Sequence, residues 1–143
     1  MIILVSNIGS TSFKFKLFDF ADNERVLAEG ANDRVGLGGS SWSVSVGDQT
    51  ASGTTDLMDH GQAIELHLEQ LVKMGAIDSI DAVDAIGFKA VHGGPIKEPV
   101  LVDDYVIQMQ EQFSDIAPQH NPPYIRAMKE FKAKLPNVPQ VAA

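Results

Sequence analysis

Three short segments of this 143-residue sequence combine residue types that bind anions. The first, residues 7–14 (NIGSTSFK), holds a glycine, three hydroxyl side chains and a lysine. Glycine lets a backbone approach a ligand closely, hydroxyls donate hydrogen bonds without adding charge, and lysine supplies a cation. These residues suit a phosphate group, and they also suit a tight turn with surface lysines. The P-loop pattern G-x-x-x-x-G-K-[ST] is absent, so any phosphate site here is of another kind.

The second segment, residues 89–94 (KAVHGG), directly follows a predicted strand. Proteins of the α/β class tend to bind ligands at the carboxyl ends of their strands, and two adjacent glycines let a chain turn sharply there. Lys89 is therefore a candidate partner for an anionic group. The alternative is a plain strand-to-loop turn with a solvated Lys89 and a hydrogen-bonded His92.

The third segment, residues 117–123 (APQHNPP), leads into a predicted helix. The free N–H groups and the partial positive charge of a helix N-terminus attract anions. His120 lies just before that terminus, where it can donate to a developing oxyanion or to a phosphoryl group in transfer. The alternative is N-terminal capping by Asn121, with His120 as a satisfied surface residue.

Strands are predicted on both sides of the first segment. The apolar, β-branched run at residues 2–5 predicts a buried strand, and the alternation of bulky apolar and basic residues at 13–18 predicts a strand with one covered face. The link at residues 6–12 is too short for a crossover helix, so we expect antiparallel pairing. We expect further strands at residues 25–31 and 42–46.

A change in hydrophobic period predicts helices later in the chain. Apolar residues within 60–74 recur at i, i+4, i+7 and i+8, with Asp59 as a candidate N-cap and Gly75 as a stop. The switch between periods of 3.6 and 2 indicates an α/β domain. The remaining predicted elements are a strand at 82–88, a helical stripe at 106–113, a helix from Asn121 to Pro136 and a strand at 138–143.

Composition narrows the class of protein. A hydrophobic content of 44% and a charged content of 21% are typical of one globular domain. The net charge of −8 argues against a nucleic-acid partner, because a phosphate backbone is bound mainly by clustered cations. With no cysteine, neither a disulfide framework nor a thiolate zinc site can form. The first apolar run is far below the roughly 20 residues that span a bilayer, so we expect a cytoplasmic protein without a membrane partner.

Taken in order, NIGSTSFKFKLFD, VHGG, IAPQHNPP and LPNVPQVA resemble the acetate and butyrate kinase family. The resemblance runs through residues 1–143 and is weakest at 36–55. It implies an α/β fold with a ribonuclease H-like core, of the actin, sugar kinase and Hsp70 ATPase type, with a mixed sheet and flanking helices. It also implies that residues 1–143 are the N-terminal domain of a two-domain carboxylate kinase. The C-terminal domain would then lie outside this chain, and the fragment alone would be inactive.

The resemblance assigns the first segment to the phosphates of a nucleotide. Asn7 matches a residue at the metal and phosphate site, and Ser10, Ser12 and Lys14 match a phosphate-facing hairpin. The implied ligands are ATP and Mg²⁺.

The other two segments receive roles at the acceptor. Lys89 falls where the family usually has an arginine that binds the carboxylate or acyl phosphate, Val91 matches a wall of the acyl pocket, and His120 matches a histidine near the transferring phosphoryl group. The implied reaction is direct, reversible, Mg²⁺-dependent transfer of the γ-phosphoryl group of ATP to a short-chain acid, with acetate giving acetyl phosphate, in a homodimer. Propionate, butyrate or another acid is an alternative acceptor. A phosphate-binding or regulatory module without catalysis is the alternative class.

Overall fold

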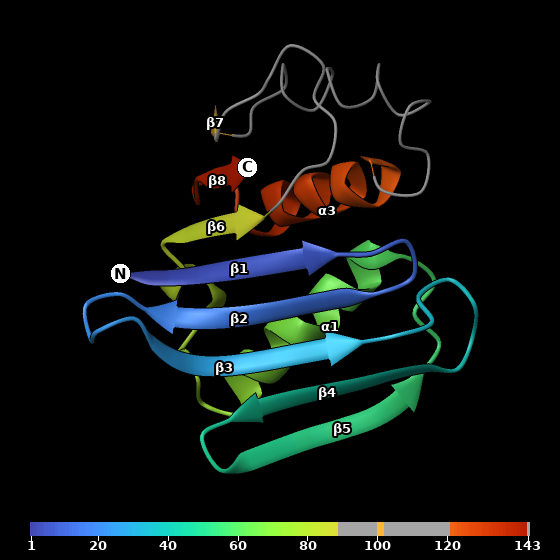
Figure 1. Ribbon diagram of the computed structural model, residues 1–143, viewed down its shortest axis with the longest axis horizontal. Helices are drawn as coiled ribbons and strands as arrows, with labels where there is room; N and C mark the ends of the chain where they lie inside the picture. The colour runs from blue at the N-terminus through green and yellow to red at the C-terminus, as the bar shows by residue number, and fades with distance from the viewer. Residues whose placement is uncertain (89–99, 102–120, 143) are drawn as a thin grey trace.

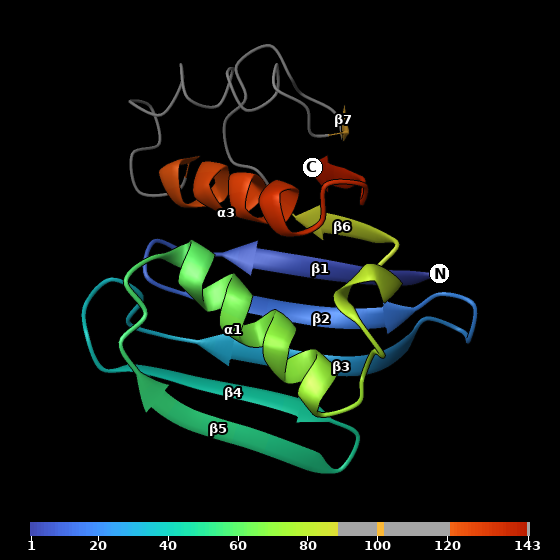
Figure 2. The same ribbon diagram turned by 180° about the vertical axis from the view of Figure 1, so that it is seen from behind.

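The computed structural model describes residues 1–88, 100–101 and 121–142, which form one eight-stranded mixed sheet with two helices against one face (Figures 1 and 2). The strand order is β5-β4-β3-β2-β1-β6-β8-β7. The strands are β1 (Ile2–Ile8), β2 (Phe13–Asp19), β3 (Arg25–Asn32), β4 (Ser40–Val46), β5 (Gln49–Thr55), β6 (Ala85–Phe88), β7 (Val100–Leu101) and β8 (Gln140–Ala142). The helices are α1 (His60–Lys73) and α3 (Asn121–Lys134), with a 3₁₀ turn at Ile80–Ala82. The predicted helical stripe at 106–113 lies outside the described residues.

The first two strands form the antiparallel hairpin that the sequence predicts. However, β1 continues to Ile8 instead of ending at Val5, so the connecting turn contains only residues 9–12. The reason is a polar residue on the helix side: Ser6 and Ile8 are both buried against the helices, while Asn7 between them is exposed. This two-residue alternation is that of a strand with one covered face.

The sheet is mixed, as the resemblance implies. Strands β2 to β5 follow one another as an antiparallel meander, whereas β6 pairs parallel with β1, and β8 pairs parallel with β6. Strand β6 begins at Ala85, later than predicted, because residues 80–82 form the 3₁₀ turn. The carboxyl ends of β1, β6 and β8 therefore point toward the same end of the sheet (Figure 1).

Helix α1 begins and ends as predicted. The Asp59 side chain accepts a hydrogen bond of 2.9 Å from the backbone N–H of Gln62, which satisfies one free N–H of the first turn. Gly75 follows the helix with φ of +80°, a conformation that glycine adopts without steric cost. Both α1 and α3 begin at the end of the sheet where the β1–β2 turn lies (Figure 2).

The hydrophobic core lies between these helices and the sheet. Its most deeply buried side chains come from both layers, and include Leu17, Ile64, Leu71, Met128 and Phe131. Within residues 1–88, 100–101 and 121–142, no helix lies over the opposite face of the sheet (Figure 1). Neither helix described here is long and apolar enough to cross a membrane.

Candidate functional site

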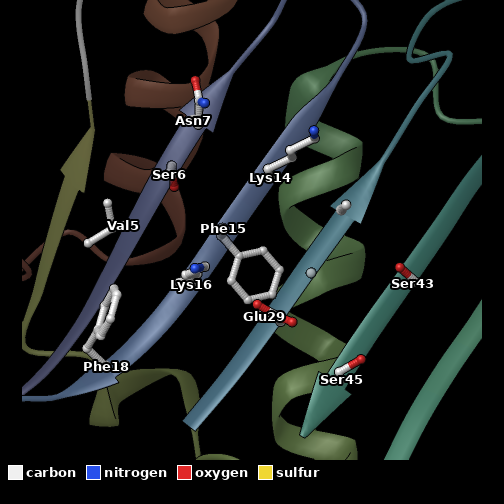
Figure 3. A pocket seen from close by; sticks show the side chains of 12 residues that line it. Val5, Ser6, Asn7, Lys14, Phe15, Lys16, Phe18, Glu29, Ser43 and Ser45 are labelled. Carbon is white, nitrogen blue, oxygen red and sulfur yellow. The ribbon is translucent and has the colours of Figure 1, made fainter. Parts of the chain in front are cut away.

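The candidate site lies at the turn end of the β1–β2 hairpin, on the sheet face that neither described helix covers. Asn7 of β1 and Lys14 of β2 are direct cross-strand partners, and both are exposed. Figure 3 shows both side chains leaving the sheet on the same side. In the described part of the chain, Lys14 forms no ion pair, so its ammonium group is available to an anion.

A shallow concavity of about 530 Å³ continues from this pair across the sheet. Its polar walls carry cations from β2 and hydroxyl groups from β4 (Figure 3). Glu29 is the cross-strand partner of Lys16, two residues farther from the turn than Lys14, so the excess positive charge lies nearest the turn. The polar residues whose side chains line the concavity are Asn7, Lys14, Lys16, Glu29, Ser43 and Ser45, whereas the side chain of Ser6, which also borders it, is buried on the helix side.

Backbone contacts define the turn between the two strands. The N–H of Gly9 donates to the carbonyl of Ser12 at 3.0 Å, and the N–H of Val35 donates to the carbonyl of Thr11 at 2.9 Å. A Cβ at position 9 would collide with the Ser12 hydroxyl, so glycine permits that hydroxyl to fold over the turn. Ser10 is exposed and Ser12 is half-buried. The turn therefore presents hydroxyl groups beside the Asn7 and Lys14 pair.

His60 holds the same turn from the helix side. Its Nε2 lies 2.9 Å from the carbonyl oxygen of Gly9 and 3.2 Å from that of Ser12. Both partners only accept hydrogen bonds, so Nε2 must carry the proton. Burial lowers the pKa of His60 below its ordinary value, against the opposing effect of these two hydrogen bonds. A neutral imidazole thus joins the start of α1 to the hairpin.

With this geometry established, comparison with known proteins places the chain. Residues 2–143 match the model of the acetokinase family. This chain belongs to the acetokinase family. The acetate kinases of Bacillus velezensis and Bacillus subtilis are each 40% identical to it over 141 residues, which is 98% of this chain and 35% of the relative. The chain therefore spans about a third of the length of these relatives.

Solved structures agree on the fold. The crystal structure of Porphyromonas gingivalis acetate kinase matches 99% of this acetokinase-family chain with a TM-score of 0.90 and 32% identity, using 36% of that protein. A propionate kinase from Francisella tularensis matches 99% of the chain with a TM-score of 0.85 at 24% identity, which is evidence for the fold alone. The mixed α/β fold implied by the resemblance is therefore confirmed.

Of the predicted site residues, the structure brings together those of the first segment. Asn7, Ser10, Ser12 and Lys14 lie on or beside one turn. No cluster of three His, Cys, Asp or Glu side chains suited to a metal occurs among the described residues. The assignment of Asn7 to a metal stays a prediction.

The other predicted residues, Lys89, Val91 and His120, lie outside the described residues. The described elements next to them in sequence can be placed. Strand β6 ends at Phe88, beside Ser6 of β1, and α3 begins at Asn121. Both termini lie at the turn end of the β1–β2 hairpin (Figures 1 and 2). The roles of the three residues stay predictions.

Sequence reasoning missed two buried histidines of α1, His60 and His67. The Nε2 of His67 lies 2.9 Å from Oδ1 of Asn32, and its ring packs against Phe13 and Phe15 at centroid distances of 5.4 and 5.1 Å. Burial lowers the pKa of His67 to about 4. The signal was present, because positions 60 and 67 fall at i and i+7 on the apolar stripe that contains Ile64.

Proposed function

We propose that this chain is the N-terminal domain of a two-domain kinase that transfers the γ-phosphoryl group of ATP to a short-chain carboxylate, with acetate giving acetyl phosphate. The observation that carries the proposal is the cross-strand pair of Asn7 and Lys14 beside a serine-bearing turn, in a chain of the acetokinase family. The curated relatives named acetate kinase support acetate as the acceptor.

Phosphoryl transfer requires mainly positioning and stabilisation of charge, so no nucleophilic side chain is needed. In the proposed site, the Lys14 ammonium binds phosphate oxygens, and the Ser10 and Ser12 hydroxyls donate to them. Each charge-assisted hydrogen bond of this kind contributes about 1.5–3 kcal/mol. The placement of Lys14 outside any described ion pair supports this role.

The donor set of the hairpin fits Mg²⁺. This ion prefers oxygen ligands and usually keeps several waters, taking one or two protein ligands together with substrate phosphates. The exposed side chain of Asn7 offers an amide oxygen next to the cation that would hold the phosphates. When bound, Mg²⁺ neutralises charge on the phosphate oxygens. The side chain of Asn7 would serve to orient the ion beside the turn.

The acceptor side of the proposed site comes from the sequence. We assign Lys89 to the carboxylate or acyl phosphate, Val91 to the wall of the acyl pocket and His120 to the phosphoryl group in transfer. The positions where β6 ends and α3 begins, at the turn end of the hairpin, support a shared site (Figure 1). A homodimer in the cytoplasm, without nucleic-acid or membrane partners, also stays a prediction.

A hydroxamate assay of the complete enzyme tests the proposal. Hydroxylamine traps acyl phosphates, so acetate, propionate and butyrate are each supplied with ATP and Mg²⁺. We expect hydroxamate to form, most rapidly with acetate. If ATP binds by calorimetry but no acid yields hydroxamate, the chain belongs instead to a phosphate-binding module without catalysis.

A further inference from the structure

The β1–β2 turn is held by contacts from two other parts of the chain. Besides its own hydrogen bond between Gly9 and Ser12, the turn receives the backbone N–H of Val35 at the Thr11 carbonyl. His60 binds the carbonyls at both ends of the turn, Gly9 at 2.9 Å and Ser12 at 3.2 Å, across 51 and 48 residues of sequence. Among the described residues, His60 is the side chain that hydrogen-bonds to both ends of the turn. We call this pair of hydrogen bonds the His60 clamp.

The helix start that carries His60 is itself fixed. Asp59 accepts the N–H of Gln62 at 2.9 Å, and the Gln62 side chain accepts the N–H of Met58 at 2.9 Å. These reciprocal bonds close the first turn of α1 around His60, much as a capping box does. His60 is only 3% exposed, so its ring has little freedom to leave the two carbonyls.

The direction of the His60 bonds determines what the turn offers to a ligand. A trans peptide is planar, so its carbonyl and the next N–H point to opposite sides. Because the Gly9 carbonyl points at His60, the N–H of Ser10 points away from α1. That N–H has no backbone partner within the described part of the chain, and Ser10 is exposed. The His60 clamp therefore orients the backbone N–H of Ser10 away from α1, beside the serine hydroxyls of the turn.

Burial, more than the surrounding charges, favours the neutral form of His60. Burial and the nearby Arg126 guanidinium lower its pKa, while Asp59 and the two carbonyls raise it, with burial the largest effect. Glu130 of α3 lies close to the neighbouring Gly61. A neutral ring with its proton on Nε2 is the form that donates to the carbonyls without adding charge beneath a phosphate site.

We infer that His60 is a positioning residue of the proposed kinase: it fixes the β1–β2 turn so that the Ser10 N–H and the turn hydroxyls meet a phosphate group. The inference rests on the proposed function. His60 touches no substrate in this role and acts only through the turn.

Two amide variants separate this role from simple packing. His60→Gln places an amide N–H near the position of Nε2, whereas His60→Asn places it about where Nδ1 lies, too short to reach the carbonyls. We expect His60→Asn to lower kcat roughly 10- to 100-fold, with the KM for acetate little changed, because a misplaced turn weakens the transition-state contacts. His60→Gln should recover most of the loss. His67→Gln, on the same face of α1 but away from the turn, should lower stability and leave kcat near wild type.

All variants are made in the complete enzyme and assayed at 20 °C. Thermal melts confirm that each variant is folded. Wild-type kcat in folded His60→Asn, or an equal loss in His60→Gln, would overturn the inference. If wild type makes no acyl phosphate, the proposed function fails, and a binding test decides the inference separately. Inorganic phosphate is titrated while NMR follows the backbone amides of residues 9–12. We expect saturable shifts in wild type and weakened shifts in His60→Asn, and identical titrations would refute the clamp.

NMR of the wild-type protein tests the His60 clamp without any variant. At pH 7.5 the His60 imidazole should be found with its proton on Nε2, and that proton should exchange slowly with water. A His60 ring in the Nδ1–H form would contradict the clamp even if no variant at this position folds.

Discussion

His67 should make the folded state sensitive to mild acid. Its ring is 2% exposed, lies between Phe13 and Phe15, and donates to Asn32. The pKa of His67 is lowered from 6.5 to about 4, and burial is its cause. The folded state therefore resists a proton that the unfolded chain accepts readily.

The sign and size of the effect follow from linkage. Above pH 6.5 the ring is neutral in both states, so His67 adds no pH dependence. Between pH 6.5 and about 4, only the unfolded chain binds the proton, and the free energy of unfolding falls as pH falls. Each pH unit costs about 1.4 kcal/mol, so the loss is about 2 kcal/mol at pH 5 and about 3 kcal/mol at pH 4. Below the folded pKa, the loss from this group stops growing.

Urea titrations from pH 7.5 to pH 5 test this expectation, comparing wild type with His67→Gln. Glutamine keeps an amide donor for Asn32 and cannot titrate. At pH 7.5 the variant should be less stable by about 1 kcal/mol, because the aromatic packing is lost. At pH 5 the wild type should have lost about 2 kcal/mol relative to the variant, which reverses their order.

The matched control is Ile64→Val on the same face of α1. It should cost about 1 kcal/mol at every pH, because it removes one buried methyl group and no titrating group. Carboxylates contribute equally to all three proteins and cancel in the comparison. If wild type and His67→Gln lose stability in parallel from pH 7.5 to pH 5, the buried histidine is not the source of the acid sensitivity.

Three further substitutions test the site and its support. Lys14→Gln should lower kcat/KM for MgATP roughly 10- to 100-fold through loss of a charge-assisted contact, with Lys16→Gln as a control that has a much smaller effect; similar losses in both would refute the role of Lys14. Asp59→Ala should reduce the free energy of unfolding by about 1 kcal/mol in urea titrations, whereas Asp59→Asn should retain most of the cap. Lys89→Arg should raise turnover on acetate, because a guanidinium binds a carboxylate with two prongs; unchanged or poorer acetate kinetics would count against a carboxylate role for this position.

The periodicity of the sequence was sufficient to predict most elements of the fold. Helix α1 and strand β2 are each covered on one face only. Hydrophobic periodicity in a sequence indicates elements of this kind. The end of β1 was wrong because Ser6 is polar yet buried, so the apolar run stopped before the strand did. This error mattered for the site, since it placed Asn7 in the short link between the strands instead of directly opposite Lys14.

The side-chain contacts that hold the site in place could not be predicted from composition or spacing. Gly30 is an example. A glycine within a strand usually weakens that strand. At position 30, however, a Cβ would collide with the Phe15 ring and crowd His67. The spacing of His60 and His67 puts both on the apolar stripe of α1, but it does not show which atoms they contact. Contacts across 51 residues, such as that of His60 with Gly9, depend on tertiary packing that local patterns do not contain.

The two faces of the β1–β2 hairpin have different roles, because successive side chains of a strand point to opposite faces. Side chains that face the helices, including Ile8, Phe13 and Phe15, anchor it in the core, where His67 packs against both phenylalanines. Asn7 and Lys14 project from the opposite face (Figure 3). A one-residue slip of the hairpin would bury the lysine and expose the phenylalanines, so the core that stabilises the fold also fixes which side chains reach the proposed phosphate.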